Sequence, residues 1–156
     1  MLNAQRKILE DSARDVDSTL VTYAGRPLSL SVTDGKLIAA TSGSKFYGLS
    51  RGNKNSYVDI TNGEFGAFGS NKMSVVKSGI IEIGPEDLSI YTGGTVFQIF
   101  DSTKTYYVND KLYVSADNLI TNDTGEANGY ENYVGRVIVP PSSTYLNMVI
   151  DLKSID

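Results

Sequence analysis

The chain has 156 residues and contains no histidine, cysteine or tryptophan. This length is enough for one domain whose core needs no disulfide or metal, and the missing residues exclude imidazole-activated nucleophiles, cysteine nucleophiles and the usual zinc sites. Fourteen Lys and Arg stand against eighteen Asp and Glu, a net charge of −4 that is the wrong sign for binding phosphates, so we expect no nucleic-acid partner.

Residues 1–22 are expected to form a polar N-terminal arm. Leu9, Ala13, Val16 and Leu20 follow one another at helical spacing. Aspartate and serine residues crowd the same segment, which lowers its helix propensity and leaves little apolar area. A short helix and an extended arm therefore both remain open, and either form would need to dock onto something else.

Residues 23–156 are expected to form a single β-rich domain. The apolar period changes to two at Leu28, Leu30 and Val32, and the Asp34-Gly35 turn leads into residues 36–40. This pattern predicts a β-hairpin with a tight turn at Gly35.

Ten further runs of strand type follow at short spacing, separated by turn dipeptides such as Asn62-Gly63, Ser78-Gly79 and Asn109-Asp110. They are residues 45–49, 57–61, 64–68, 72–77, 80–83, 95–100, 105–108, 111–115, 133–139 and 145–152. Many short strands with frequent turns predict a mainly β fold, a compact antiparallel β-barrel or β-sandwich.

Little in the sequence points to catalysis or to a cofactor. Glu64 and Glu82 are the candidate carboxylates, but Glu82 lies between two isoleucines on an alternating strand and is expected to face solvent. The oxygen-rich segment 117–126 lacks the ligand spacing of a calcium loop. We therefore expect no enzyme, no metal and no cofactor.

The ten tyrosines could form a carbohydrate-binding surface, but sheet packing and subunit contacts are the favoured interpretation of Tyr106, Tyr107, Tyr113, Tyr130 and Tyr133. No apolar run is long enough to cross a membrane, and the first residues lack the apolar stretch of a secretory signal. We expect no membrane partner and a product made in the cytoplasm of its host cell.

The second half of the chain resembles a known family. The segment Tyr107 to Ser115 (YVNDKLYVS), then Asn118 to Thr121 (NLIT), then Val134 to Val137 (VGRV) and Pro140-Pro141 are similar to the C-terminal pattern of tailed-bacteriophage capsid decoration (cement) proteins. Asn109 and Asn118 stand where that pattern has glycine. Asparagine is the commonest residue other than glycine at positive φ, so the same turns remain possible. The turn positions of the resemblance are Gly35, Gly63, Asn109, Asp110, Asn118 and Gly135.

The resemblance implies a compact, β-tulip-like barrel fold and a head-stabilising role. A protein of this kind is usually a homotrimer that binds the major capsid protein on the outer surface of the virion, between capsomers, and resists the pressure of packed DNA. A β-rich receptor- or glycan-binding module of a phage tail or fibre is the alternative. The arm and the first residue of the domain would supply the apolar contacts to the capsid or to a neighbouring subunit, for which the candidates are Leu2, Ile8, Leu9, Val16, Leu20 and Tyr23.

Overall fold

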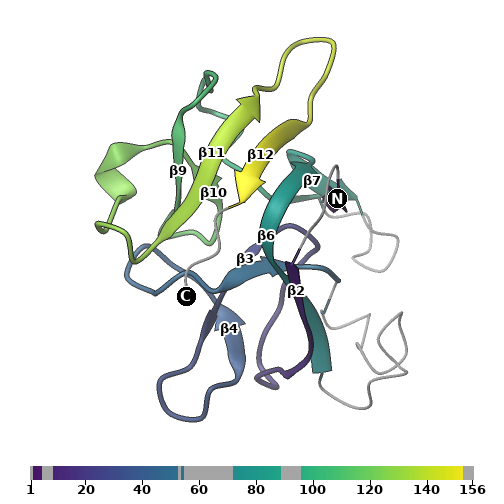
Figure 1. Ribbon diagram of the computed structural model, residues 1–156, viewed down its shortest axis with the longest axis vertical. Helices are drawn as coiled ribbons and strands as arrows, with labels where there is room; N and C mark the ends of the chain where they lie inside the picture. The colour runs from purple at the N-terminus through teal and green to yellow at the C-terminus, as the bar shows by residue number, and fades with distance from the viewer. Residues whose placement is uncertain (1, 5–8, 53, 55–71, 89–95, 153–156) are drawn as a thin grey trace.

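The computed structural model describes residues 2–4, 9–52, 54, 72–88 and 96–152. Within these ranges the chain is mainly β, as predicted, and its helical content is one short 3-10 turn (Figure 1). The strands are β1 Leu2–Ala4, β2 Leu9–Asp15, β3 Pro27–Leu30, β4 Leu37–Ala39, β5 Gly48–Ser50, β6 Lys72–Ile83, β7 Glu86–Leu88, β8 Val96–Gln98, β9 Lys111–Val114, β10 Ile120–Thr121, β11 Tyr133–Val139 and β12 Met148–Leu152, and the 3-10 turn is η3 Thr124–Glu126.

One antiparallel sheet of ten strands, in the order β10-β9-β11-β12-β6-β5-β3-β4 with β1 and β2 also on β6, curls into a half-barrel (Figure 1). The long strand β6 holds it together. Its first half pairs with β2 and β5, and its second half pairs with β12 and β1. We call the two parts the first lobe (β2 to β5 with the start of β6) and the second lobe (β9 to β12 with the end of β6).

The apolar core forms two clusters. The larger one joins the lobes, because Tyr23, Phe46 and Leu49 of the first lobe pack with residues such as Ile81 and Val134 of the second. The smaller one lies within the first lobe and includes Leu28, Leu37 and Met73. Since all of these side chains are almost completely buried, the two lobes fold around a shared interior.

The N-terminal arm is extended where it is described. Residues Leu9–Asp15 form strand β2, whose register runs from Leu9 opposite Ser78 to Asp15 opposite Lys72. Of the two forms left open by the sequence, the extended one is correct for this segment. Pairing with β6 supplies the backbone hydrogen bonds that a weak helix former would otherwise have to make within its own segment.

The predicted hairpin is present, with a wider turn. Strands β3 and β4 pair with Leu30 opposite Leu37, and Gly35 has a φ of +71°. The loop covers residues 31–36, closed by a hydrogen bond from the Ser31 amide to the Lys36 carbonyl. Val32 is fully exposed in that loop, so the predicted strand with apolar alternation ends at Leu30 rather than at Val32.

Two other local predictions are wrong. Residues 78–79 are not a turn, because β6 continues through them and Gly79, at a φ of +124°, pairs with Leu152. Residues 105–108 are not a strand, since the Asp110 carboxylate accepts the Tyr107 amide and holds a turn there. The predicted strands 57–61 and 64–68 lie outside the described residues.

Candidate functional site

Two asparagines in the turns of the sequence resemblance lie in the left-handed backbone conformation. Asn109 and Asn118 have φ values of 70° and 62°, the only residues besides glycine at positive φ among those described. Asp110 Oδ2 accepts hydrogen bonds from the Tyr107 amide and from Asn122 Nδ2, both at 2.8 Å. Both asparagines therefore occupy glycine-like positions, as the sequence predicted.

Gly135 also has a geometric requirement. It lies where the pairing of β11 with β9 shifts register, and on the other side it pairs with Leu152 of β12. A Cβ atom at this position would collide with the carbonyl group of Asp151. Gly63, the remaining glycine of the resemblance, is outside the described residues.

Three of the six predicted contact residues do not lie on the surface. Val16, Leu20 and Tyr23 are 3%, 5% and 1% exposed and belong to the core clusters. They are thus not available to a capsid or a subunit in this conformation, which corrects the sequence-based assignment. Leu2 is half-buried against the larger cluster. Ile8 lies outside the described residues, and of Leu9 only the strand pairing is described.

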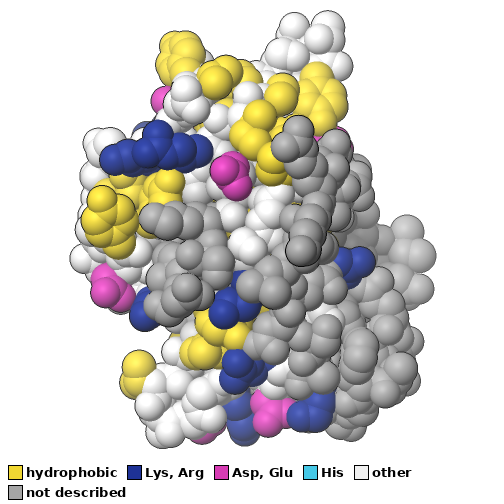
Figure 2. Space-filling model, viewed as in Figure 1, with side chains coloured by type: hydrophobic (Ala, Val, Ile, Leu, Met, Phe, Trp, Pro, Cys, Tyr) yellow, Lys and Arg dark blue, Asp and Glu magenta, His cyan; other side chains and the backbone are white. Residues whose placement is uncertain are grey.

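Exposed apolar side chains instead collect at the end of the second lobe, where β11 and β12 are joined (Figure 2). The turn at residues 107–110 lies against the same strand, because the Asn109 amide donates to the Val137 carbonyl at 2.8 Å. We call this surface the apolar end, and its members are Tyr107, Val108, Ile138, Val139, Tyr145 and Leu146.

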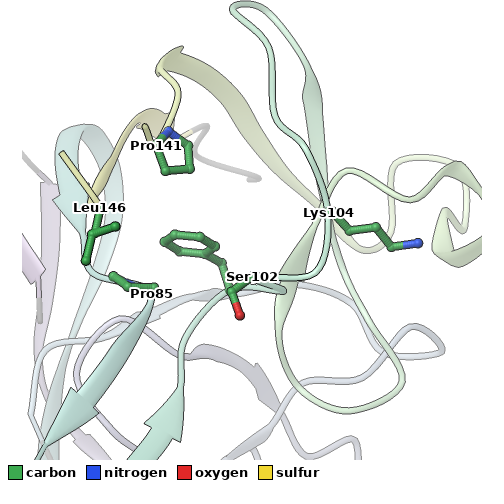
Figure 3. Close-up of a pocket in the computed structure, with 6 residues that line it drawn as sticks. Pro85, Ser102, Lys104, Pro141 and Leu146 are labelled. Atoms are coloured by element: carbon green, nitrogen blue, oxygen red, sulfur yellow. The ribbon is translucent and has the colours of Figure 1, made fainter. Parts of the chain in front are cut away.

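A pocket of about 280 Å³ opens at the apolar end (Figure 3). Pro141 and Leu146 of the β11–β12 loop stand on one side of it, with Pro85 below them, and buried Phe100 also lines it. The ammonium group of Lys104 points away from the pocket. This ammonium group pairs with the Asp123 carboxylate at 2.8 Å. Because the charge of Lys104 is directed elsewhere, the walls around the pocket are mainly apolar.

The Lys104–Asp123 pair also fixes the neighbouring loop. The hydrogen bond with Lys104 lowers the pKa of Asp123 below its ordinary value, and the hydrogen bond from the Gly125 amide adds a smaller effect in the same direction. The same ion pair raises the pKa of Lys104. Both groups are thus charged at neutral pH, and Asp123 accepts the Gly125 amide at the start of η3.

The β11–β12 loop is held in one shape by its own hydrogen bonds. The Ser142 amide donates to the Tyr145 carbonyl at 2.7 Å, and the Tyr145 amide donates to Ser142 Oγ at 3.1 Å. At its base Asn147 Nδ2 donates to Glu82 Oε1 at 2.5 Å. A hydrogen bond to the Glu82 carboxylate raises the pKa of the Tyr145 hydroxyl. A loop ordered in advance loses less entropy when it binds.

The tyrosines divide into two groups. Tyr106, Tyr113 and Tyr133 are buried, and the rings of the last two meet edge to face with centroids 6.0 Å apart. These three confirm the packing interpretation. Tyr107 and Tyr130 are 66% and 76% exposed, so their rings remain accessible to a partner.

Of the two candidate carboxylates, the structure describes only Glu82. Glu82 lies between buried Ile81 and Ile83 as predicted, but it is half-buried and anchors the β11–β12 loop instead of being fully in solvent. Glu64 lies outside the described residues. Within the described ranges no cluster of three acidic side chains is arranged to hold a metal ion. No described helix has the length and apolar character of a membrane span.

The sequence pattern does not reveal the apolar end, because it predicts a single strand over residues 145–152. Strand β12 begins only at Met148. Pro140-Pro141-Ser142-Ser143 was the available signal, since two prolines followed by two serines favour a loop that continues past Ser143. In comparisons with known proteins, no family model and no curated sequence matches this chain.

Proposed function

We propose that this protein is a non-enzymatic decoration protein of a tailed-bacteriophage head. It binds the major capsid protein on the outer surface of the virion, between capsomers, and stabilises the head against internal pressure. The observation that carries the proposal is the apolar end, in which a hydrogen-bonded loop presents exposed Leu146 beside an apolar pocket. The positive φ values of Asn109 and Asn118 support the sequence resemblance on which the identity of the partner rests.

The apolar end would act as the docking surface. Leu146 is 64% exposed and Tyr145 is 39% exposed, so both have apolar area to bury against a partner. Full burial of one leucine contributes about 1.5–3 kcal/mol, which is modest for a single copy. Many copies on one particle, or three copies in a trimer, would raise the overall strength of attachment without new contacts.

The test is co-sedimentation with expanded heads of the phage that encodes the protein. Leu146→Ser should weaken binding about tenfold or more, because the polar side chain forfeits most of the burial energy. Val21→Ser is the matched control, since Val21 is also exposed, at 49%, but belongs to the first lobe. Heads carrying the wild-type protein should also survive higher temperatures. Absence of binding, or equal loss in both variants, would contradict the proposal.

The homotrimer is a separate part of the proposal and has its own measurement. Light scattering of the free protein, and the copy number on decorated heads, should both give multiples of three. A monomer in solution that also binds heads as isolated single copies would rule it out.

A glycan-binding module of a tail or fibre is the second candidate. The exposed rings of Tyr107 and Tyr130 favour it, because sugars commonly stack on accessible aromatic faces. A sugar array distinguishes the two functions. Retention on glycans that is lost in Tyr130→Ala, together with no binding to heads, would support this candidate over the decoration protein.

A further inference from the structure

A second pocket lies in the first lobe, on elements that take no part in the apolar end. Its volume is about 320 Å³, and its walls include Leu30 and Val32 after strand β3, Lys45 and Tyr47 before β5, and Lys77 of β6. Leu30 is half-buried and Val32 fully exposed, so one wall offers apolar surface to a ligand.

The wall of the pocket that contains Lys45 and Tyr47 is held in place by hydrogen bonds to its backbone. Ser29 Oγ donates to the Lys45 carbonyl at 2.6 Å, and the Tyr47 amide donates to the Leu28 carbonyl at 2.8 Å. Both bonds tie the segment 45–47 to strand β3. The pocket therefore exists before any ligand arrives.

Two cations lie over the ring of Tyr47. Lys77 Nζ lies 4.6 Å from the centre of its ring, and the guanidinium carbon of Arg14 lies 5.2 Å from the same point. Arg14 Nη2 also donates to the Tyr47 hydroxyl at 2.7 Å. Lys45 adds a third positive charge to the wall. In a chain of net charge −4, this is a local concentration of the opposite sign.

Two of these cations have no carboxylate partner in the part of the chain that the structure describes. Among the described residues, neither Lys45 nor Lys77 forms an ion pair, whereas Lys36, Lys72 and Lys104 each have an aspartate partner. An anionic ligand could thus bind to Lys45 and Lys77 without displacing an existing carboxylate. The cations already over the ring of Tyr47 leave less of it for the stacking contact that a neutral sugar would use.

We propose that this pocket binds an acidic peptide segment of a partner protein. One carboxylate of the peptide lies between Lys45 and Lys77, and a neighbouring apolar side chain packs against Leu30 and Val32. Charge complementarity selects the carboxylate, and the apolar wall selects a peptide over a small inorganic anion. The inference does not depend on the role of the apolar end.

The probe is a capped peptide of alternating valine and glutamate, titrated into the full-length protein and followed by NMR. We expect shift changes centred on Lys45, Tyr47 and Lys77. The peptide with glutamine in place of glutamate should bind at least about fivefold more weakly, because it lacks the charge. Raising the salt concentration to about 0.5 M should weaken binding of the glutamate peptide alone.

The matched variants are Lys77→Gln and Lys45→Gln against Lys111→Gln, which removes the same charge from an exposed site on β9 in the other lobe. Each pocket variant should raise the dissociation constant about two- to fivefold, while Lys111→Gln should leave it unchanged. Equal effects of all three variants, equal binding of both peptides, or preferential binding of a uronic-acid oligosaccharide would overturn the proposal. None of these readouts involves phage heads, so they are independent of the decoration assay.

Discussion

The side-chain amide of Asn118, in the second lobe, donates a 2.7 Å hydrogen bond to the backbone carbonyl of Ala40, which follows strand β4 in the first lobe. The same nitrogen donates to the Pro27 carbonyl, also at 2.7 Å. Asn118 is 8% exposed, so both bonds are shielded from water. A residue that sequence reasoning treats as a substitute for glycine in a turn therefore also ties the two lobes together.

Replacing Asn118 by Gly separates these two roles. Glycine accepts the φ of 62° but cannot donate to Ala40 or Pro27, so the free energy of unfolding should fall by about 1–3 kcal/mol. Asn109→Gly is the control, because Asn109 has nearly the same φ of 70° and is exposed. There the stability should stay the same or rise by up to about 1 kcal/mol. Urea unfolding gives the free energy of unfolding of both variants. Equal changes would show that the hydrogen bonds of Asn118 between the lobes do not contribute to stability.

Gly135→Ala tests the close approach of β11 and β12. The added methyl group would meet the Asp151 carbonyl, and backbone atoms cannot move aside as a flexible side chain can. We expect a loss of at least about 2 kcal/mol in the free energy of unfolding. Gly43→Ala is the control because nothing lies within 4 Å of its Cβ position, and its effect should stay within about 0.5 kcal/mol. Thermal and urea unfolding measure the free energy of unfolding of both variants. Equal losses in the two would show that the close approach of β11 and β12 at Gly135 is not the cause.

The strand pattern was predictable where apolar alternation and turn residues agree. Strand β11 has the predicted bounds, Tyr133–Val139, and the positive φ at Asn109 and Asn118 follows from residue type. The continuation of β6 through Ser78-Gly79 was not predictable from that dipeptide. It results from the strand passing from partners in one lobe to partners in the other.

The candidate site was less accessible to sequence reasoning than the fold. The Asn118 bonds span 91 and 78 positions along the chain, and Asn147 reaches Glu82 across 65 positions. No local pattern encodes contacts of this range. Exposure is also a property of the folded chain, so the sequence pattern predicts partner contacts for Val16 and Leu20 although both pack inside.

The Tyr106 hydroxyl should make stability depend on pH in alkaline solution. Burial raises the pKa of Tyr106 well above its ordinary value near 10, and the hydroxyl donates to the Asp101 carbonyl at 2.8 Å. Below pH 10 the proton is bound in both the folded and the unfolded state. As the pH rises above 10 the unfolded chain loses this proton first, which favours unfolding by about 1.4 kcal/mol per pH unit.

Tyr106→Phe should therefore lower stability at pH 7 by about 1 kcal/mol, through the lost hydrogen bond, and reduce the fall in stability above pH 10. Urea unfolding of wild type and variant between pH 8 and 11 gives both quantities. If the free energy of unfolding falls with pH equally in wild type and variant over that range, Tyr106 does not carry the pH dependence.

Glu82 should control the order of the β11–β12 loop. Its carboxylate accepts from Asn147 Nδ2 and raises the pKa of the Tyr145 hydroxyl by hydrogen bonding. In Glu82→Ala both contacts disappear, so the pKa of Tyr145 should fall toward its ordinary value. The Tyr145 amide, which donates to Ser142 Oγ, should exchange its hydrogen faster, by about tenfold or less, because the loop loses the anchor at its base.

The Tyr145 ring carbon signal followed against pH by NMR reports the pKa, and amide exchange reports the order of the loop. Glu131→Ala is the control, because Glu131 is exposed on a different loop and its replacement removes the same charge. Glu82→Gln separates charge from hydrogen bonding, since the amide oxygen of the new side chain can still accept from Asn147 while the charge is gone. It should lower the pKa of Tyr145 and leave amide exchange closer to wild type than Ala does. If Ala and Gln accelerate exchange equally, the charge of Glu82 rather than its hydrogen bond to Asn147 orders the loop.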